Sequence, residues 1–226
     1  MQSVGIQNGF LLFGAVGSLG LLLALYLTDL RIHAKTVLTR KTFCPNPINL
    51  LVFILSLGID GILVVVLADL FTADYDITTG LLIVVAFYLM LKRLFMVAVS
   101  FVAGLISIMV NPVKLFNISV IFCLLSCFLI VAGQLVLGVL LAFIFNAIVV
   151  TFAPLISVAN DEHNALQAIS GVSTWWDMGA AFGAFLGIIL IEKLGREKLF
   201  LIIAGFIALT FVNFIIQNGK RNRAIL

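Results

Sequence analysis

Four ionisable side chains lie inside long apolar stretches of this sequence. Asp60 occurs in LGIDGIL, Lys92 and Arg93 are adjacent in MLKRLFMV, and Asp177 occurs in STWWDMG. An ionisable side chain within a membrane span is energetically expensive and is by default a candidate functional residue. We expect these four to line a water-filled path, where they bind a polar solute or exchange a proton. The alternative is structural: an ion pair between helices, or cations whose side chains extend toward the membrane interface.

Asn146 and Trp176 are neutral side chains that belong to the same hypothesis. Asn146 is the one strongly polar residue deep within the apolar run 135–158. Its amide is expected either to form an ordinary hydrogen bond between helices or to contact the solute. Trp175 and Trp176 directly precede Asp177, and two interpretations of them stay open: an aromatic belt at the membrane interface, or a cavity wall that stacks on a solute.

The composition excludes a water-soluble globular protein. The 226 residues are 63% hydrophobic and 10% charged, whereas a soluble domain has roughly 45–50% apolar and about 25% charged residues. The apolar runs lack the period-2 alternation of a membrane β-strand, and several exceed the ~18 residues typical of a membrane-spanning helix. We therefore predict an all-α polytopic membrane protein surrounded by the lipid bilayer.

The apolar runs predict about seven transmembrane helices. Their expected ranges are 5–28, 47–71, a third that starts near residue 79, 113–132, 135–158, 169–191 and 199–216. Lys92 and Arg93 are placed inside the third helix, because a loop there would leave ~13 apolar residues before it, about 20 Å of helix. That length is short of a hydrocarbon core of about 30 Å. The stretch FYLMLKRLFMV also has no Gly, Pro, Asn or Asp to form a turn.

Basic residues set the expected orientation. The segment DLRIHAKTVLTRK is the strongest basic loop, and positive loops stay in the cytoplasm. The N-terminus is then outside and the C-terminus cytoplasmic, with one exception to the rule, because the basic segment EKLGREK falls outside. From the helix rise, Asp177 is expected at roughly 12 Å from the cytoplasmic edge, Lys92 and Arg93 at roughly 10 Å, and Asp60 at roughly 20 Å.

The partners of the two cations stay open in this scheme. Adjacent residues on a helix diverge by about 100°, so Lys92 and Arg93 are not expected to share one partner. Asp177 lies at their expected depth, Asp60 lies higher, and a group on another part of the protein is the third possibility.

A stripe of small residues marks the sixth predicted helix. Gly179, Gly183 and Gly187 recur every four residues, with Ala180 and Ala184 beside them. Such a stripe lets a neighbouring backbone come close. Tight static packing is the default expectation, and sliding between helices is the alternative.

The sequence patterns of the common enzymes are missing. There is no Ser/His/acid set, no H-E-x-x-H, no aspartyl pair and no P-loop within the predicted spans. Both histidines, His33 and His163, fall in predicted loops, and Cys44, Cys123 and Cys127 form no metal or disulfide framework. We expect no enzyme activity, cofactor, metal or nucleic-acid partner.

Two segments carry a resemblance to a known family. ISGVSTWWDMGAAFGAFLGIILIEKLGREKLFLIIAGF resembles helices 11 and 12 of the major facilitator superfamily. In many efflux members of that family, helix 11 carries Asp-x-Gly followed by glycines at four-residue spacing. Asp177, Gly179, Gly183 and Gly187 match this pattern.

The second segment, AGLISIMVNPVKLFN, lies where the family has a cytoplasmic loop motif, G-x-x-x-D-R-x-G-R-R, after helix 8. Gly104 and Lys114 fit this degenerate motif, whereas its Asp falls on Ile108 and its Arg on Met109. In the family these charges help to hold the inner gate, so the departure argues against gating by that device.

The resemblance implies that the chain corresponds to family helices 6 to 12. The implied organisation is a helix equivalent to family helix 6 (1–30), a basic cytoplasmic loop between the two halves (31–46), a six-helix C-terminal transporter half (47–218) and a basic cytoplasmic tail (219–226). The expected partner is then a missing N-terminal half or a second polypeptide, and the expected location is a bacterial cytoplasmic (inner) membrane.

The function implied by the resemblance is secondary active transport. Family members alternate access around a site near the membrane midplane, and the expected cargo is a small polar or amphipathic solute coupled to protons. Asp60 and Asp177 would bind a proton or cation, and Lys92 and Arg93 would compensate them or bind an anionic group. The alternative is a non-transporting scaffold or partner subunit, or an inactive truncated gene product. A seven-span retinal protein is disfavoured because the last predicted span contains no lysine.

Overall fold

The computed structural model describes Ser18 and residues 45–75, 80–106, 110–160 and 164–224. The chain divides into two compact units, Met1–Arg40 and Lys41–Leu226, and all the helices named here belong to the second. The expected first span (5–28, apart from Ser18), almost all of the basic loop (31–46), and His33, Cys44 and His163 lie outside the described residues.

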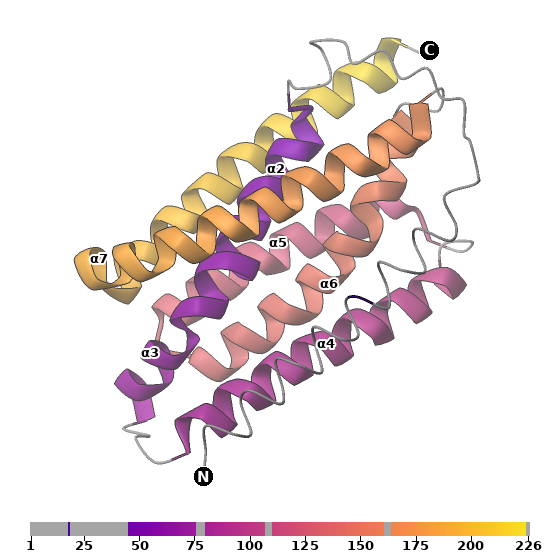
Figure 1. The fold of residues 1–226 in the computed structure, drawn as a ribbon. Coiled ribbons are helices and arrows are strands. Elements are labelled where there is room, and N and C mark those ends of the chain that lie inside the picture. The colour runs from indigo at the N-terminus through magenta and orange to yellow at the C-terminus, as the bar shows by residue number, and fades with distance from the viewer. Residues whose placement is uncertain (1–17, 19–44, 76–79, 107–109, 161–163, 225–226) are drawn as a thin grey trace. The chain divides into compact units, whose positions relative to one another are not determined.

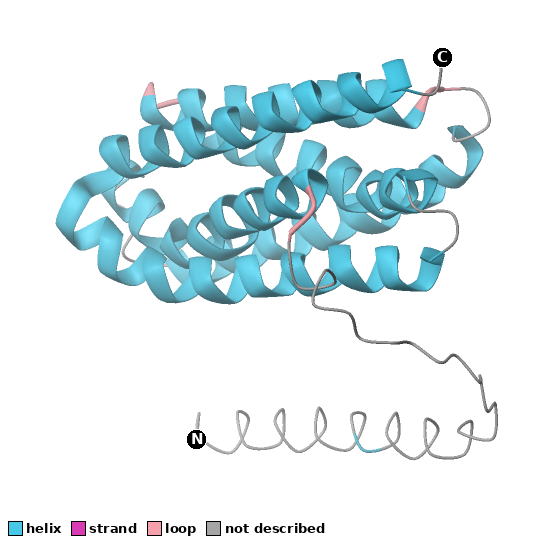
Figure 2. Cartoon of the chain, turned by 90° about the horizontal axis from the view of Figure 1, so that it is seen from above, coloured by secondary structure: helices cyan, strands magenta, loops and turns pink. Residues whose placement is uncertain are grey.

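The described part of the chain is helical and contains no strands (Figures 1 and 2). Its elements are α2 (Pro47–Leu55), η2 (Ser56–Leu63), α3 (Val64–Tyr75), α4 (Leu81–Ile106), α5 (Pro112–Val131), α6 (Leu135–Asn160) and α7 (Ala165–Ala224). The first three run on as one helix, because the junction residues Ser56 and Val64 keep helical backbone angles. The middle piece, η2, is a π-helix.

Five helical segments are long and apolar enough to cross a membrane. They are Pro47–Thr72, Leu81–Ala103, Pro112–Val131, Leu135–Ala159 and Ala165–Gly219. Many large apolar side chains on their outer faces are exposed, among them Leu82, Ile83, Val97 and Phe101 of α4. A water-soluble monomer rarely exposes such surface. The all-helical prediction is confirmed for the described residues, and these helices indicate an integral membrane protein.

α7 folds back on itself at one residue. Gly195 has φ 72° and ψ 170°, whereas the residues on both sides are helical, and this backbone region is essentially restricted to glycine. The reversal separates a first arm (165–194) from a second arm (196–224), which lie side by side in Figure 1. The predicted spans 169–191 and 199–216 fall in these two arms. The expected loop EKLGREK is therefore helical except at its glycine, and the expected tail continues as helix to Ala224.

Other helix ends follow from local sequence. Pro47 and Pro112 occupy first-turn positions of α2 and α5, where the absence of an amide hydrogen is harmless. The Asn111 side chain caps α5 by accepting a hydrogen bond from the Val113 amide at 3.0 Å. Gly133, with φ 80°, reverses the chain between α5 and α6, at the short link that the sequence predicts.

α4 runs without a break through Lys92 and Arg93, as the helix-length argument predicts. It lies beside α6 at one edge of the bundle (Figure 1). In the most apolar 18-residue stretch of α4, only 11% is buried, against 61% in the corresponding stretch of the helix that begins at Pro47. α4 is therefore a peripheral helix, and it packs on the core through partly buried side chains, namely Leu81, Val84, Val85, Tyr88 and Phe95.

The glycine stripe of the first arm lies directly on the α2–η2 helix. A Cβ atom on Gly179 would collide with the Phe53 carbonyl oxygen, and one on Gly183 with the Leu57 carbonyl oxygen. One on Gly187 would lie 3.2 Å from Cα of Ile62. The residue numbers of the glycines and of their partners increase in the same direction along the contact, so the two helices run parallel.

Along this contact the partner residues advance by four, from Phe53 to Leu57, and then by five, from Leu57 to Ile62. The glycines advance by four each time. The extra residue falls within the π-helix η2 (Ser56–Leu63), and an insertion of this kind is what a π-bulge accommodates. The glycine packing and the π-helix are therefore parts of one arrangement.

Candidate functional site

Asp60 and Lys92 form a buried ion pair between two helices. Lys92 Nζ on α4 lies 2.5 Å from Asp60 Oδ1 on η2, and the two side chains are 10% and 12% exposed. Lys92 is thus the cation that points into the bundle, and Asp60 is its partner among the three that the sequence left open.

Asn146 connects a third helix to this pair. Its Nδ2 donates to both carboxylate oxygens of Asp60, at 3.1 Å and 3.3 Å, and the residue is 1% exposed. An ionised carboxylate only accepts hydrogen bonds, so the amide must present its nitrogen to Asp60. Of the two roles considered for Asn146, the structure has the bond between helices.

Phe143 completes the cluster from the same face of α6. Lys92 Nζ lies 5.5 Å from the centroid of the Phe143 ring, within the range of a cation–π interaction. Phe143 precedes Asn146 by three residues, the spacing that places two side chains on one helix face. Sequence reasoning missed Phe143, although this spacing from Asn146 could have identified it. We call Asp60, Lys92, Phe143 and Asn146 the ion-pair cluster.

One polar atom of the cluster has no partner. Asn146 Oδ1 is buried without a hydrogen bond, as are Asn49 Oδ1 and Asn117 Oδ1 elsewhere in the described residues. Leaving a buried acceptor unsatisfied costs about 1–3 kcal/mol. The ion-pair cluster therefore holds one unused acceptor beside a buried carboxylate.

The π-helix explains how Asp60 is presented. Gly61, the next residue, faces the first arm of α7, where a Cβ would lie 2.5 Å from Cα of Gly183. Gly58 faces the second arm, against Ile203. With η2 held on this side by α7, Asp60 points toward α4 and α6 instead. π-helical segments are frequent at functional sites.

The depth estimate that separated Lys92 from Asp60 is wrong. It placed Asp60 about a third of the bilayer above Lys92, whereas the two side chains are in contact. The membrane-length part of α4 extends to Ala103, so Lys92 lies about 16 Å before that end at the rise of a helix. The estimate failed because the sequence did not show how far α4 continues.

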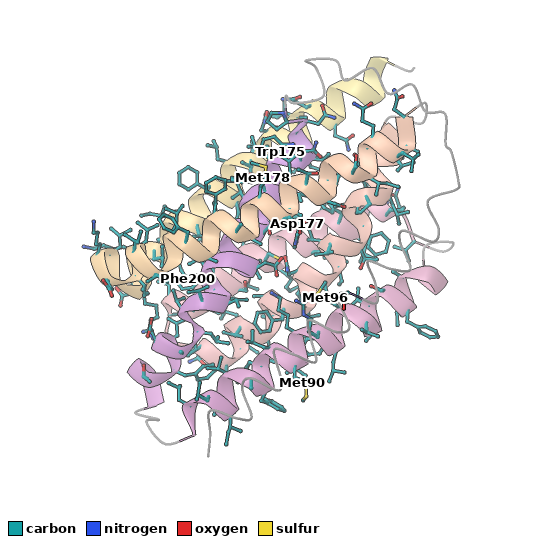
Figure 3. All side chains as sticks on the ribbon, in the orientation of Figure 1. Met90, Met96, Trp175, Asp177, Met178 and Phe200 are labelled. Atoms are coloured by element: carbon teal, nitrogen blue, oxygen red, sulfur yellow. The ribbon has the colours of Figure 1, made fainter. Side chains whose placement is uncertain are left out.

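Arg93 and Asp177 do not belong to the cluster. Arg93 is exposed, and its Nη1 donates to Met96 Sδ at 3.8 Å on the same helix. Met96 lies on the side of α4 nearer α6 and Met90 points away (Figure 3). Asp177 is exposed on the first arm of α7 and makes no hydrogen bond or ion pair within the described part of the chain. No Asp177–Arg93 pair is formed.

The tryptophans pack against the α2–η2 helix. The Trp176 carbonyl accepts a hydrogen bond from Ser56 Oγ at 2.7 Å, and its side chain is half-buried against the core. Trp175 meets the Phe53 ring edge-on, with centroids 5.8 Å apart. Trp175 and Asp177 point to different sides of the first arm (Figure 3).

The remaining candidates lie at helix ends. Gly104 is near the C-terminal end of α4, and Lys114 is exposed in the first turn of α5. Lys114 takes no part in the ion pair or hydrogen bonds of the ion-pair cluster. Within the described ranges, no three His, Cys, Asp or Glu side chains come together as metal ligands.

A separate hollow lies at the turn between the two arms of α7. It measures about 600 Å³ and is lined by Asp69, Leu70, Ile191 and residues 194–198. Asp69 is about 13 Å beyond Asp60 at the rise of a helix, so this hollow is not part of the ion-pair cluster.

No protein-family model, curated protein or solved structure matches this chain. The resemblance to the major facilitator superfamily thus stays a prediction from the motifs around Asp177 and Gly104. A function must be argued from the geometry of the bundle.

Proposed function

We propose that this chain is the C-terminal part of a secondary active transporter of the major facilitator type. It moves a small polar or amphipathic solute, coupled to protons, across a cytoplasmic membrane. The observation that carries the proposal is the Asp60–Lys92 pair, which joins two membrane-length helices and is hydrogen-bonded to a third through Asn146.

The pair offers a way to couple a proton to helix movement. When Asp60 takes up a proton, its carboxylate becomes neutral and the attraction to the Lys92 ammonium is lost. Lys92 forms the ion pair between α4 and the bundle, and α4 has the smallest buried share of the five membrane-length segments. Protonation at Asp60 therefore releases α4 and turns the free ammonium toward water or solute.

The exposed face of the first arm of α7 supports a water-filled space beside the bundle. Ser170, Thr174 and Asp177 are all exposed there, and their spacing of four and three residues places them on one helix face. The Ser170 and Thr174 hydroxyls donate to the backbone carbonyls of Gln167 and Ser170. The Asp177 carboxylate is therefore the group that requires a polar environment, because an ionisable side chain at membrane depth faces water or protein rather than lipid. A cavity shared with an opposing half would provide such an environment.

The second candidate function is a non-transporting partner subunit. Its support comes from Asp177 and Arg93, which are both charged, exposed and outside the ion-pair cluster. Within a membrane complex they would pair with opposite charges on another polypeptide, and the ion-pair cluster would serve only to hold α4.

Proton flux in proteoliposomes separates the two functions. The purified chain, alone and co-reconstituted with a fragment that supplies five further helices, is challenged with ethidium, a thiogalactoside and benzoate, while an enclosed pH-sensitive dye is monitored. The transporter proposal expects solute-driven proton movement that Asp60→Asn abolishes and Asp69→Asn preserves, because Asp69 is exposed and outside the cluster. Proton flux that is equal in the wild-type, Asp60→Asn and Asp69→Asn chains, or missing from all three, contradicts the proposal.

A further inference from the structure

We propose that Asp60, Phe143 and Asn146 form a binding site for an alkylammonium group, and that the ammonium group of Lys92 occupies this site when no solute is bound. A solute that carries a primary amine would enter this site by displacing the Lys92 ammonium. The inference rests on the proposed transport function for access to the site, and it names the solute class as amines.

The three side chains provide what an ammonium ion requires. Asp60 supplies a buried anionic acceptor 2.5 Å from the nitrogen, and charge-assisted bonds of this kind are the strong ones. Phe143 supplies an aromatic ring 5.5 Å from the same nitrogen, the arrangement that recognises cationic ligands. Asn146 holds the carboxylate in place through both of its oxygens.

Lys92 does not use everything that the site offers. An ammonium group has three N–H donors, whereas the Lys92 ammonium makes one ion pair and one ring contact in the described part of the chain. Asn146 Oδ1, at the other end of the amide that contacts Asp60, remains buried and unpaired. A free amine is not restrained by the α4 backbone and can adjust its position to donate to that oxygen as well.

The exchange keeps the charge in the site balanced. One ammonium replaces another, so Asp60 stays paired throughout and no buried carboxylate is left alone. Lys92 has to move outward with α4, the helix with the smallest buried share among the five membrane-length segments. Both side chains of the pair keep a small exposed fraction, 10% and 12%, so neither is completely enclosed by the bundle.

Chemical rescue with n-butylammonium tests the proposal on the full chain in lipid nanodiscs. Lys92→Ala removes the ammonium and its stem and leaves Asp60 unpaired, so the thermal midpoint is expected to fall. Millimolar n-butylammonium should restore it, whereas n-butanol and butyrate should not. Arg93→Ala is the matched control, because it removes the adjacent exposed cation and should show no amine-specific shift.

Three further variants complete the test. Lys92→Ala combined with Asp60→Asn should lose the rescue, because the anionic acceptor is gone. If Lys92→Ala alone does not fold, direct binding of n-butylammonium is measured on the wild-type, Asp60→Asn and Asp69→Asn chains. Loss of a charge-assisted bond predicts about 10- to 100-fold weaker binding of n-butylammonium to Asp60→Asn. Asp69→Asn should bind n-butylammonium with the same affinity as the wild type.

The outcomes separate this inference from the transport proposal. Rescue or binding that is insensitive to Asp60→Asn overturns the ammonium site, even if solute-driven proton flux is present. Asp60-dependent amine binding without any proton flux, with n-butylammonium included among the solutes of the proteoliposome assay, keeps the site and removes the transport function.

Discussion

Gly61 of η2 and Gly183 of α7 face each other with no room for a side chain between them. A Cβ on Gly61 would lie 2.5 Å from Cα of Gly183 and 2.7 Å from the Ala180 carbonyl oxygen. This contact holds the π-helix against the first arm, while the neighbouring residue Asp60 reaches α4 and α6 on another side. Helix packing and the position of the carboxylate are thus set by the same few residues.

The first prediction concerns this contact. Gly183→Ala adds a Cβ that meets the Leu57 backbone, and backbone cannot move aside as a flexible side chain can. Overpacking of this kind costs about 1–3 kcal/mol, measurable as a lower free energy of unfolding in detergent or bicelles. Gly205→Ala is the control, because a Cβ added at that helical glycine would have no neighbouring atom within 4 Å. Equal effects at the two positions would contradict the close contact.

The second prediction concerns the coupling of Asp60 and Lys92. Asp60→Asn and Lys92→Met each leave a buried charge without its partner, and each should cost about 3–5 kcal/mol of unfolding free energy. The double variant removes both charges and should be more stable than the sum of the two losses predicts. Arg93→Met should change the unfolding free energy by less than about 0.5 kcal/mol, as expected for a surface substitution. Additive losses would show that the pair contributes no coupling.

The third prediction concerns the turn in α7. Gly195→Ala forces a residue with a side chain into a backbone region that is essentially restricted to glycine, at a cost of about 1–3 kcal/mol. The cause is backbone strain alone, because a Cβ added at Gly195 would have no neighbouring atom within 4 Å. Gly219→Ala is an equally unobstructed position in the helical part of the second arm, and it should be neutral or slightly stabilising. A neutral Gly195→Ala would contradict the observed backbone angles.

Several features of the bundle could be predicted from the sequence because they depend on local pattern and length. The uninterrupted α4 follows from the length of a membrane-spanning helix, and the reversal at Gly133 follows from a short Gly-Gln link. The segment EKLGREK was expected to be a loop because it is rich in charge. It is helical around Gly195 instead, since charged residues are as compatible with an exposed helix surface as with a loop.

The partner of Lys92 could not be predicted in the same way. Depth along a helix requires knowing where the helix ends, and α4 continues to Ile106. Predicting the partner also requires the rotation of each helix about its axis, which decides the side chains that face a neighbouring helix. The π-helix around Asp60 changes this rotation and has no recognisable signature in SLGIDGIL. Phe143 was missed for a related reason: its spacing of three residues places it on the same face of α6 as Asn146, but nothing in the sequence showed that this face meets Lys92.

The fourth prediction concerns Asp177, which is charged, exposed and without a hydrogen bond or ion pair in the described residues. Asp177→Asn removes no packing contact, so the free energy of unfolding should change by less than about 0.5 kcal/mol. If Asp177 lines the transport path beside Ser170 and Thr174, the same substitution should abolish or strongly reduce solute-driven proton flux in proteoliposomes. Asp69→Asn, the exposed carboxylate on α3, should leave both quantities unchanged. Normal flux in Asp177→Asn would remove this residue from the mechanism and leave Asp60 as the carboxylate that exchanges the proton.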